Sequence, residues 1–139
     1  MYMKIDFKNI LKINGFKSTP SRIAILELFS SDCKPVNAED IFRKVNKITD
    51  QVTVYRTLNS FEEKGILRRV DLRKGSAYYE LNNKHHHHHI VCKKCGLIEI
   101  FNGCEIDKIS KKILSKSLKF KNVTEHSFEL FGFCKTCTK

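Results

Sequence analysis

Apolar residues recur every three or four positions through residues 5–65, the spacing that is typical of amphipathic helices. Capping residues and glycines separate four such segments, and Gly15 and Gly65 are suited to end the first and the fourth. The predicted helices are residues 5–14 with Phe7, Ile10 and Leu11; a segment opened by Thr19 and Pro20 with Ile23, Leu26 and Phe29; a segment capped by Asn37 with Ala38, Ile41, Phe42 and Val45; and a segment capped by Asp50 with Val54, Leu58 and Phe61.

Two short strands are predicted after the fourth helix, at residues 66–72 and 77–81. The residues between them, Arg73 to Ser76, contain Gly75 and predict a turn. Helices followed by a basic β-hairpin are the arrangement of a winged helix-turn-helix domain.

The second half of the chain has a different pattern. It predicts strands around Ile90 and over residues 97–101, an amphipathic helix marked by Ile106, Ile109, Ile113 and Leu118, and an extended segment over residues 120–133. The polar residues 82–84 predict a hinge between a domain of residues 1–82 and a domain of residues 83–139. A small sheet with one helix leaves an apolar face, which a homodimer would cover. We therefore predict an α+β protein, with an N-terminal winged helix-turn-helix domain and a C-terminal α/β dimerisation domain.

The net charge of the chain indicates which class of partner it binds. The net charge of +11 over 139 residues favours a polyanion, most commonly nucleic acid, although a solvated lysine-rich surface would give the same value. No apolar run approaches the roughly 20 residues needed to span a bilayer, so no membrane partner is expected. The N-terminus also lacks the apolar core of a signal peptide, and we expect a cytoplasmic protein.

The fourth helix is the expected recognition helix. Its apolar positions face inward, which leaves Tyr55, Arg56 and Asn59 on other faces, where arginine can bind guanine or phosphate. The hairpin carries four cations that would follow the DNA backbone: Arg68, Arg69, Arg73 and Lys74. The alternative interpretation is a basic, solvated face on a small helical domain.

Two Cys-x-x-Cys pairs, Cys92 with Cys95 and Cys134 with Cys137, predict a metal site in the second domain. Two such pairs are typical of a tetrathiolate zinc site with a structural role. The alternative is a pair of disulfides, which needs an oxidising compartment that the N-terminus does not indicate.

Five consecutive histidines, His85 to His89, precede the first cysteine pair. An expression tag is the alternative explanation, but tags sit at termini and this run continues into an apolar strand. Strand residues alternate between two faces, so His87 and His89 would point one way and His86 and His88 the other. The run is therefore expected to supply two different metal sites. Other donors within the chain are Glu80, Asp107 and His126.

The whole chain resembles the ferric uptake regulator family of metal-sensing bacterial repressors. The matching motifs, in the family's order, are Thr19 to Arg22, Ala38 to Ile41, Thr53 to Asn59, the histidine run through Cys95 and Gly96, and His126 through Cys137. The resemblance implies a winged-helix domain that contacts double-stranded operator DNA and a domain that forms a homodimer, with higher oligomers on DNA. The expected DNA-contacting residues are Lys17, Thr53, Tyr55, Arg56, Asn59 and Arg73.

The resemblance also implies the metal sites. The structural zinc would bind Cys92, Cys95, Cys134 and Cys137, and a second site would comprise His86, His88, Asp107 and His126. The family's sensory site at the hinge would use Glu80, His87 and His89 here. Two positions of that site lack a donor, because Pro35 and Ile100 stand where the family carries ligands. Cys33 is the candidate donor outside the usual register, and a thiolate there would favour zinc over manganese.

These observations predict a metal-dependent transcriptional repressor of metal-homeostasis or oxidative-stress genes, with iron as the main candidate and manganese(II) and zinc(II) as alternative regulatory metals. A zinc-sensing or peroxide-sensing member of the same family is the alternative, although Ile100 stands where the peroxide-sensing branch carries Asp. A zinc enzyme is disfavoured because no His-Glu-x-x-His motif occurs. A cytosolic metal-storage protein would leave the residues 53–59 and the basic hairpin without a role.

Overall fold

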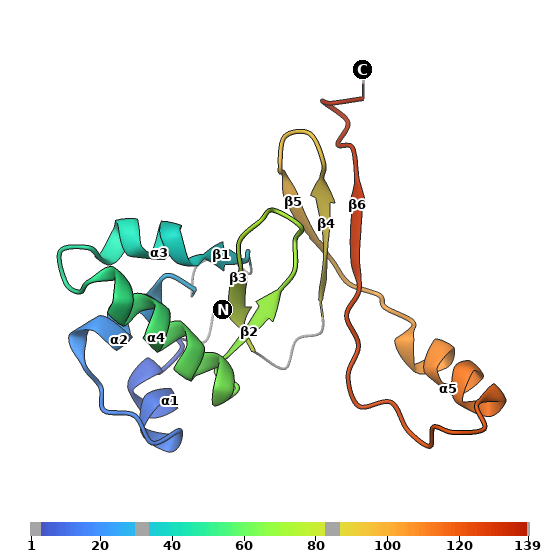
Figure 1. Ribbon diagram of the computed structural model, residues 1–139, viewed down its shortest axis with the longest axis horizontal. Coiled ribbons are helices and arrows are strands. Elements are labelled where there is room, and N and C mark those ends of the chain that lie inside the picture. The colour runs from blue at the N-terminus through green and yellow to red at the C-terminus, as the bar shows by residue number, and fades with distance from the viewer. Residues whose placement is uncertain (1–3, 30–33, 83–86, 139) are drawn as a thin grey trace. The chain divides into compact units, whose positions relative to one another are not determined.

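A computed structural model describes residues 4–29, 34–82 and 87–138. The chain forms two compact units, residues 1–84 and residues 85–139, and each is described by itself. The first unit contains α1 (Phe7–Ile13), α2 (Pro20–Glu27), β1 (Val36–Asn37), α3 (Ala38–Val45), α4 (Gln51–Glu63), β2 (Leu67–Val70) and β3 (Tyr78–Leu81) (Figure 1). The second contains β4 (His88–Cys92), β5 (Ile98–Phe101), α5 (Ile106–Lys116) and β6 (Glu129–Gly132). Within the described residues, no helix has the length and apolar character needed to cross a membrane.

The helices of the first unit begin where the capping pattern predicts. The side chains of Thr19, Asn37 and Asp50 accept hydrogen bonds from backbone N–H groups in the first turns of α2, α3 and α4, at 3.4, 2.8 and 2.7 Å. Each bond satisfies a donor that has no partner inside its helix. Gly65 follows α4 with a φ of +74°, a conformation that glycine adopts without the steric cost of a Cβ atom.

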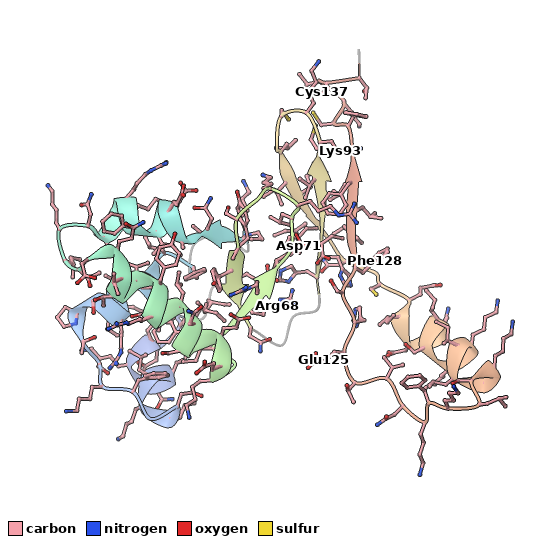
Figure 2. The ribbon with its side chains drawn as sticks, viewed as in Figure 1. Arg68, Asp71, Lys93, Glu125, Phe128 and Cys137 are labelled. Atoms are coloured by element: carbon pink, nitrogen blue, oxygen red, sulfur yellow. The ribbon has the colours of Figure 1, made fainter. Side chains whose placement is uncertain are left out.

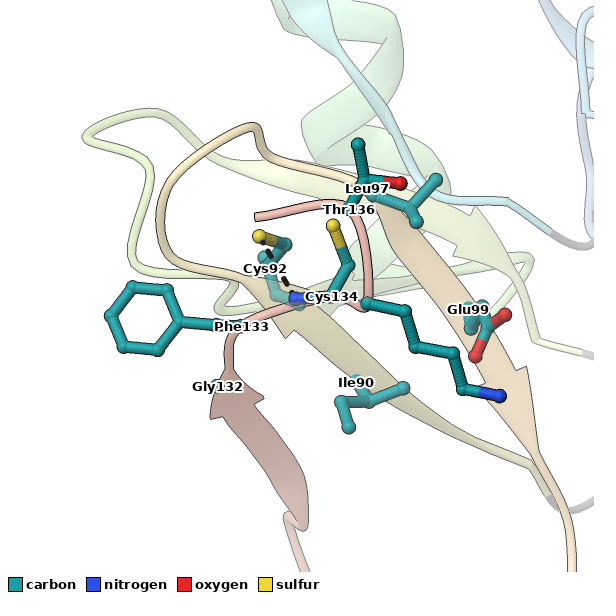
Figure 3. Close-up of a pocket in the computed structure, with 10 residues that line it drawn as sticks. Ile90, Cys92, Leu97, Glu99, Gly132, Phe133, Cys134 and Thr136 are labelled. Atoms are coloured by element: carbon teal, nitrogen blue, oxygen red, sulfur yellow. Dashed lines mark hydrogen bonds between the residues drawn. The ribbon is translucent and has the colours of Figure 1, made fainter. Parts of the chain in front are cut away.

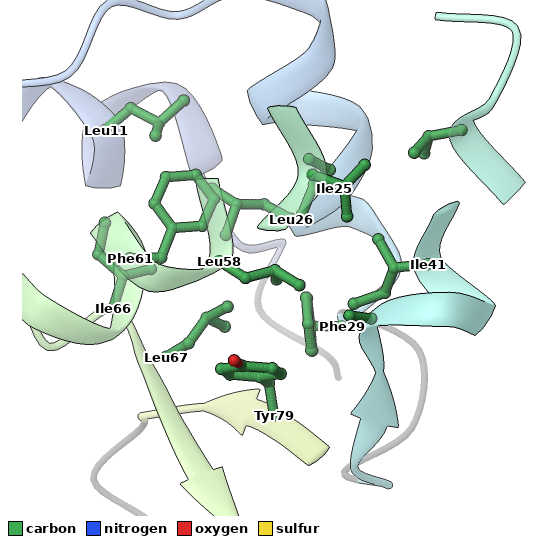
Figure 4. Close-up of a cluster of buried hydrophobic side chains, with 13 residues drawn as sticks. Leu11, Ile25, Leu26, Phe29, Ile41, Leu58, Phe61, Ile66, Leu67 and Tyr79 are labelled. Atoms are coloured by element: carbon green, nitrogen blue, oxygen red, sulfur yellow. The ribbon is translucent and has the colours of Figure 1, made fainter. Parts of the chain in front are cut away.

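The core of the first unit lies where the apolar faces of these helices meet the sheet (Figure 4). Its fully buried members include Leu11 of α1, Ile25 of α2, Ile41 of α3 and Phe61 of α4. Complete burial of such a side chain contributes about 1.5–3 kcal/mol. The amphipathic pattern therefore fixes which face of each helix is available to a partner: the face opposite this core.

A three-stranded antiparallel sheet in the order β1–β3–β2 completes the first unit. Strands β2 and β3 form the predicted hairpin, with Leu67 opposite Leu81 and Val70 opposite Tyr78. The connection between them includes Arg73 and Gly75 at φ values of +55° and +79°. Strand β1, only two residues long, was not predicted from sequence because its pairing with β3 is not encoded in a local pattern. Helices α3 and α4 with this hairpin form the winged helix-turn-helix fold.

The second unit contains a three-stranded sheet in the order β5–β4–β6. Strand β4 is antiparallel to β5 and parallel to β6, with His89 opposite Glu129 and Cys92 opposite Gly132. Within the extended segment predicted over residues 120–133, the structure contains one short strand. Only Glu129–Gly132 forms a strand, because only these four residues align with β4. Helix α5 is present as predicted, but none of its residues is buried.

Candidate functional site

The four paired cysteines meet at one end of the second sheet. Cys92 ends β4, and the parallel pairing of β4 with β6 carries the chain from Gly132 to Cys134 beside it. The backbone N–H of Cys134 donates to Cys92 Sγ at 3.4 Å (Figure 3), and Cys95 Sγ lies 3.7 Å from Cys134 Sγ. All four sulfurs lie within 4.8 Å of one another. The cysteines are free thiols, and 3.7 Å far exceeds the about 2.05 Å of a disulfide bond.

These sulfurs fit a zinc ion. With zinc–sulfur bonds of about 2.3 Å, two ligands of a tetrahedral zinc are about 3.8 Å apart, which agrees with the Cys95–Cys134 separation of 3.7 Å. The backbone N–H groups of Cys95 and Cys134 lower the pKa of Cys92 to about 5, so this sulfur is a ready thiolate. The adjacent sulfur of Cys134, with burial and the other thiols, raises the pKa of Cys137 to about 12. Four thiolates this close repel one another unless a cation lies among them, and such a set closes the zinc shell to water.

Strand β4 separates the histidines onto two faces. The rings of His87 and His89 pack edge to face with centroids 5.2 Å apart, and both side chains are buried. His88 packs instead against Phe101 and Phe128, with ring centroids 5.6 and 5.3 Å apart. Each face of the strand therefore carries its own imidazole donors.

The predicted hinge donors occupy different parts of the chain. His87 and His89 belong to the second unit, whereas Glu80 lies on β3 of the first. The Glu80 carboxylate forms an ion pair with Arg68 of β2, the residue labelled in Figure 2. Cys33 lies outside the described residues. The hinge set therefore stays a prediction.

The second face of β4 brings together two of the four donors predicted for the second site, His88 and His126, with a residue that was not predicted, Cys104. His126 Nε2 lies 3.4 Å from His88 Nε2 and 3.8 Å from Cys104 Sγ. Asp107, the expected acidic donor, is exposed in the first turn of α5 and is not part of this cluster, and His86 lies outside the described residues. Cys104 is the residue that sequence reasoning missed. The available signal was that it is one of two cysteines outside the Cys-x-x-Cys pairs.

The exposed face of α4 carries the predicted recognition residues. Tyr55, Arg56 and Asn59 are exposed, while Val54 and Leu58 of the same helix are fully buried. The backbone N–H of Thr53 donates to the Asp50 cap, so α4 begins just before these side chains. The cap also lowers the pKa of Asp50, mainly because its carboxylate accepts the Thr53 N–H. A negative charge at this N-terminus interacts favourably with the helix dipole.

The cations of the hairpin are not equivalent. Arg68 pairs with Glu80, and Arg69 pairs with Glu62 at 3.2 Å and also donates to Tyr79. The expectation that all four cations follow DNA is therefore weakened for these two. Arg73 lies in the exposed turn, where its backbone N–H donates to Asp71. Lys74 lies in the same turn, with its ammonium 5.5 Å from the centre of the Tyr78 ring.

Lys17, expected beside the recognition helix, is exposed in the segment between α1 and α2. Its carbonyl oxygen accepts a hydrogen bond from the Arg22 guanidinium at 3.0 Å. That guanidinium also lies over the Phe16 ring, 5.2 Å from its centre. The contacts hold the backbone at Lys17 against α2.

Comparisons with known proteins agree with this architecture. Residues 13–131 match the ferric uptake regulator family. The ferric uptake regulation protein of Neisseria meningitidis is 36% identical over 137 residues, covering 94% of each chain. The structure of the ferric uptake regulator from Francisella tularensis with iron has a TM-score of 0.77 at 36% identity, covering 90% of this chain and 96% of that one. The Vibrio cholerae ferric uptake regulator also has a TM-score of 0.77, at 34% identity, with coverage of 93% and 100%.

The resemblance drawn from the motifs is thus confirmed, and it extends over both units. This family consists of transcription regulators rather than enzymes, and its winged helix-turn-helix domain and cysteine cluster are both present here. The chain belongs to the ferric uptake regulator family of metal-dependent transcriptional repressors.

Proposed function

We propose that this protein is an iron-responsive repressor that binds double-stranded operator DNA as a homodimer in the cytoplasm. The observation that carries the proposal is the exposed face of α4, with Tyr55, Arg56 and Asn59 on a helix whose opposite face is fully buried. A rigid helix that presents an arginine and a tyrosine in this way can enter the major groove and read base edges. Lys17, Thr53 and Arg73 would add contacts to the phosphates.

A homodimer is supported by the apolar surface of the second unit. Ile109 and Ile113 of α5 are 51% and 57% exposed, and Phe133, next to β6, is 59% exposed. Exposed apolar residues this numerous mark an interface more often than a solvated surface. A second copy of the chain would cover them and would present two recognition helices. Operator half-sites would then be related by a twofold axis.

Metal would control the population of the DNA-binding arrangement. We propose that Glu80, His87 and His89, with Cys33 as the additional donor, bind the regulatory ion and couple the two units. His88 and His126, with His86 and Asp107, would form the second site. Without metal, freedom at the hinge would lower the fraction of dimers whose recognition helices are correctly spaced, and apparent affinity would fall in proportion. Iron is supported by relatives that are named ferric uptake regulation proteins and by the Francisella protein with iron.

Zinc sensing is the second candidate. Its support is the donor set. Because Pro35 and Ile100 are not metal ligands, the proposed hinge site keeps three donors at the family's positions, and Cys33 would be the fourth. Three donors with one more suit tetrahedral zinc, whereas iron(II) and manganese(II) favour five or six. The identity of the regulatory metal therefore distinguishes iron sensing from zinc sensing.

Selection from a random duplex DNA library tests the function and identifies the operator in the same experiment. The zinc-loaded protein would be incubated anaerobically with the library and with iron(II), manganese(II), zinc(II) or no added metal. We expect an inverted repeat to be enriched only with a regulatory metal, and with iron(II) at the lowest concentration. Enrichment of the same repeat without added metal would contradict metal dependence. Failure to enrich any sequence would contradict DNA recognition.

A further inference from the structure

The cluster of His88, Cys104 and His126 lies within the second unit, where three different segments converge. His88 begins β4, Cys104 lies between β5 and α5, and His126 lies between α5 and β6. Aromatic rings cover one side of the cluster, since Phe101 and Phe128 pack on His88 and also on each other at 6.0 Å. The side chain of His88 is buried, and those of Cys104 and His126 are half-buried.

The separations of the donor atoms match a metal site. Two nitrogen ligands of a tetrahedral zinc are about 3.3 Å apart, and a nitrogen and a sulfur about 3.6 Å, for bonds of about 2.0–2.1 and 2.3 Å. The corresponding separations here are 3.4 Å for the two imidazole nitrogens and 3.8 Å for Cys104 Sγ with His126 Nε2. All three donor atoms lie within 4.8 Å of one another. An ion could therefore bind with little rearrangement of these side chains.

We propose that Cys104 is a direct metal ligand, and that the second site of this protein is a two-histidine, one-thiolate site for zinc or a similar borderline metal. A thiolate selects zinc and cobalt over manganese and magnesium, whose preferred ligands are oxygen atoms. Three protein donors leave a fourth position, which water or the Asp107 carboxylate would fill. The inference deepens the second site of the proposed function, but it concerns coordination and does not depend on DNA binding.

Cobalt(II) provides the test because a thiolate ligand gives it a charge-transfer absorption band in the near ultraviolet, while a tetrahedral shell gives intense visible bands. The full chain is first loaded with one equivalent of zinc to fill the four-cysteine site, and cobalt(II) is then titrated anaerobically. Zinc content measured afterwards must remain one per chain. We expect the wild-type protein to bind cobalt(II) at the second site with a thiolate band.

Three variants assign that band. Cys104→Ser, made together with Cys33→Ser, should abolish it and weaken cobalt binding at the second site at least about tenfold. Cys33→Ser removes the thiolate proposed for the hinge, so a band that remains in this variant comes from Cys104, and Asp107→Asn should also retain a band. Absence of the band from wild type, or its persistence in the double variant, would overturn the proposal. Loss of the band in Cys33→Ser alone would overturn it as well, by assigning the thiolate to the hinge.

A measurement on the wild-type chain tests the same assignment without depending on the folding of a variant. Alkylation by iodoacetamide, mapped by mass spectrometry, is compared with one and with two equivalents of zinc. We expect the second equivalent to reduce labelling of Cys104 at least about tenfold, because a coordinated thiolate is not available to the reagent. Equal labelling of Cys104 with and without the second equivalent would overturn the assignment. Because this readout needs no DNA, it would stand even if the chain failed to select an operator.

Discussion

Arg56 lies on the exposed face of α4, and the next two residues of the helix, Thr57 and Leu58, are buried. The side chains of α4 that are available to DNA are therefore different from those that stabilise the fold. Sequence periodicity alone predicted it, because the apolar stripe of an amphipathic helix determines which residues face away from the core. Removal of an exposed side chain here should affect the partner and not the fold.

We predict that Arg56→Ala weakens binding to the selected operator by about 1–3 kcal/mol, the usual loss when a bidentate base contact is removed. Zinc content and the free energy of unfolding should stay at wild-type values. Fluorescence anisotropy with labelled duplex measures the affinity. Lys111→Ala is the matched control, because it removes one exposed positive charge from α5. Equal losses in both variants would indicate a general charge effect and not base recognition.

The ion pair of Arg68 with Glu80 is the residue-scale feature that the sequence did not reveal. The two residues are twelve positions apart and become neighbours only because β2 and β3 pair in a register that places them opposite each other. From the sequence, Arg68 was predicted to contact the DNA backbone and Glu80 was predicted to bind a metal ion. In the structure, Arg68 binds the Glu80 carboxylate and would compete for it with a metal ion.

Removal of Arg68 should therefore destabilise the metal-free protein. We expect Arg68→Met to lower the free energy of unfolding by about 1–3 kcal/mol, less than for a fully buried pair because Arg68 is over a third exposed. The double variant with Glu80→Gln should recover most of this loss, since no buried carboxylate then lacks its partner. Denaturant unfolding measures both. A double variant that is as unstable as the sum of the single variants would rule out coupling.

At the scale of elements, helices were predictable and strands less so. The caps Thr19, Asn37 and Asp50 are local signals that mark helix starts within a few residues. Strands β1 and β6 depend instead on partners that are distant in sequence, which no local pattern encodes. Cys104 escaped prediction for the same reason, because its neighbours His88 and His126 come from other segments.

The Asp50 cap gives helix α4 a pH dependence. Its pKa lies below the ordinary value of 3.8 because the folded backbone donates to the carboxylate, so the cap is fully stabilising above that value. The contribution is lost as the pH falls through the lowered pKa. We expect Asp50→Asn, which keeps an acceptor without the charge, to show a smaller loss of stability than wild type between pH 5 and pH 3. Denaturant unfolding at each pH measures the difference, and parallel curves would contradict a role for this charge.

At the scale of the molecule, the second unit is small and its helix α5 buries no residue. A unit of this kind needs a metal or an interface to supply stability that its own core does not. The two cysteine pairs could be predicted as a zinc site from their spacing. The exposed apolar residues could be predicted only as a helix pattern, because the surface proposed to cover them belongs to a second copy of the chain.

Loss of the zinc site should therefore unfold the second unit. Zinc binding in small structural sites contributes about 10 kcal/mol or more, which exceeds the stability of a typical domain of this size. We predict that Cys137→Ser lowers zinc content and dissociates the dimer in sedimentation experiments. Cys33→Ser, a control outside the four-cysteine set, should leave both unchanged. A zinc-free, stably dimeric Cys137→Ser protein would show that the site is dispensable for assembly.

The most direct test of metal-dependent repression is the operator affinity of one zinc-loaded preparation, measured by anisotropy with and without iron(II). A chelator that leaves the four-cysteine zinc in place defines the metal-free state. A coupling of about 5–150-fold, typical of allosteric regulators, is the predicted increase in affinity on adding iron(II). Equal affinity in the two states, with zinc content unchanged at one per chain, would contradict the central claim that a regulatory metal controls DNA binding.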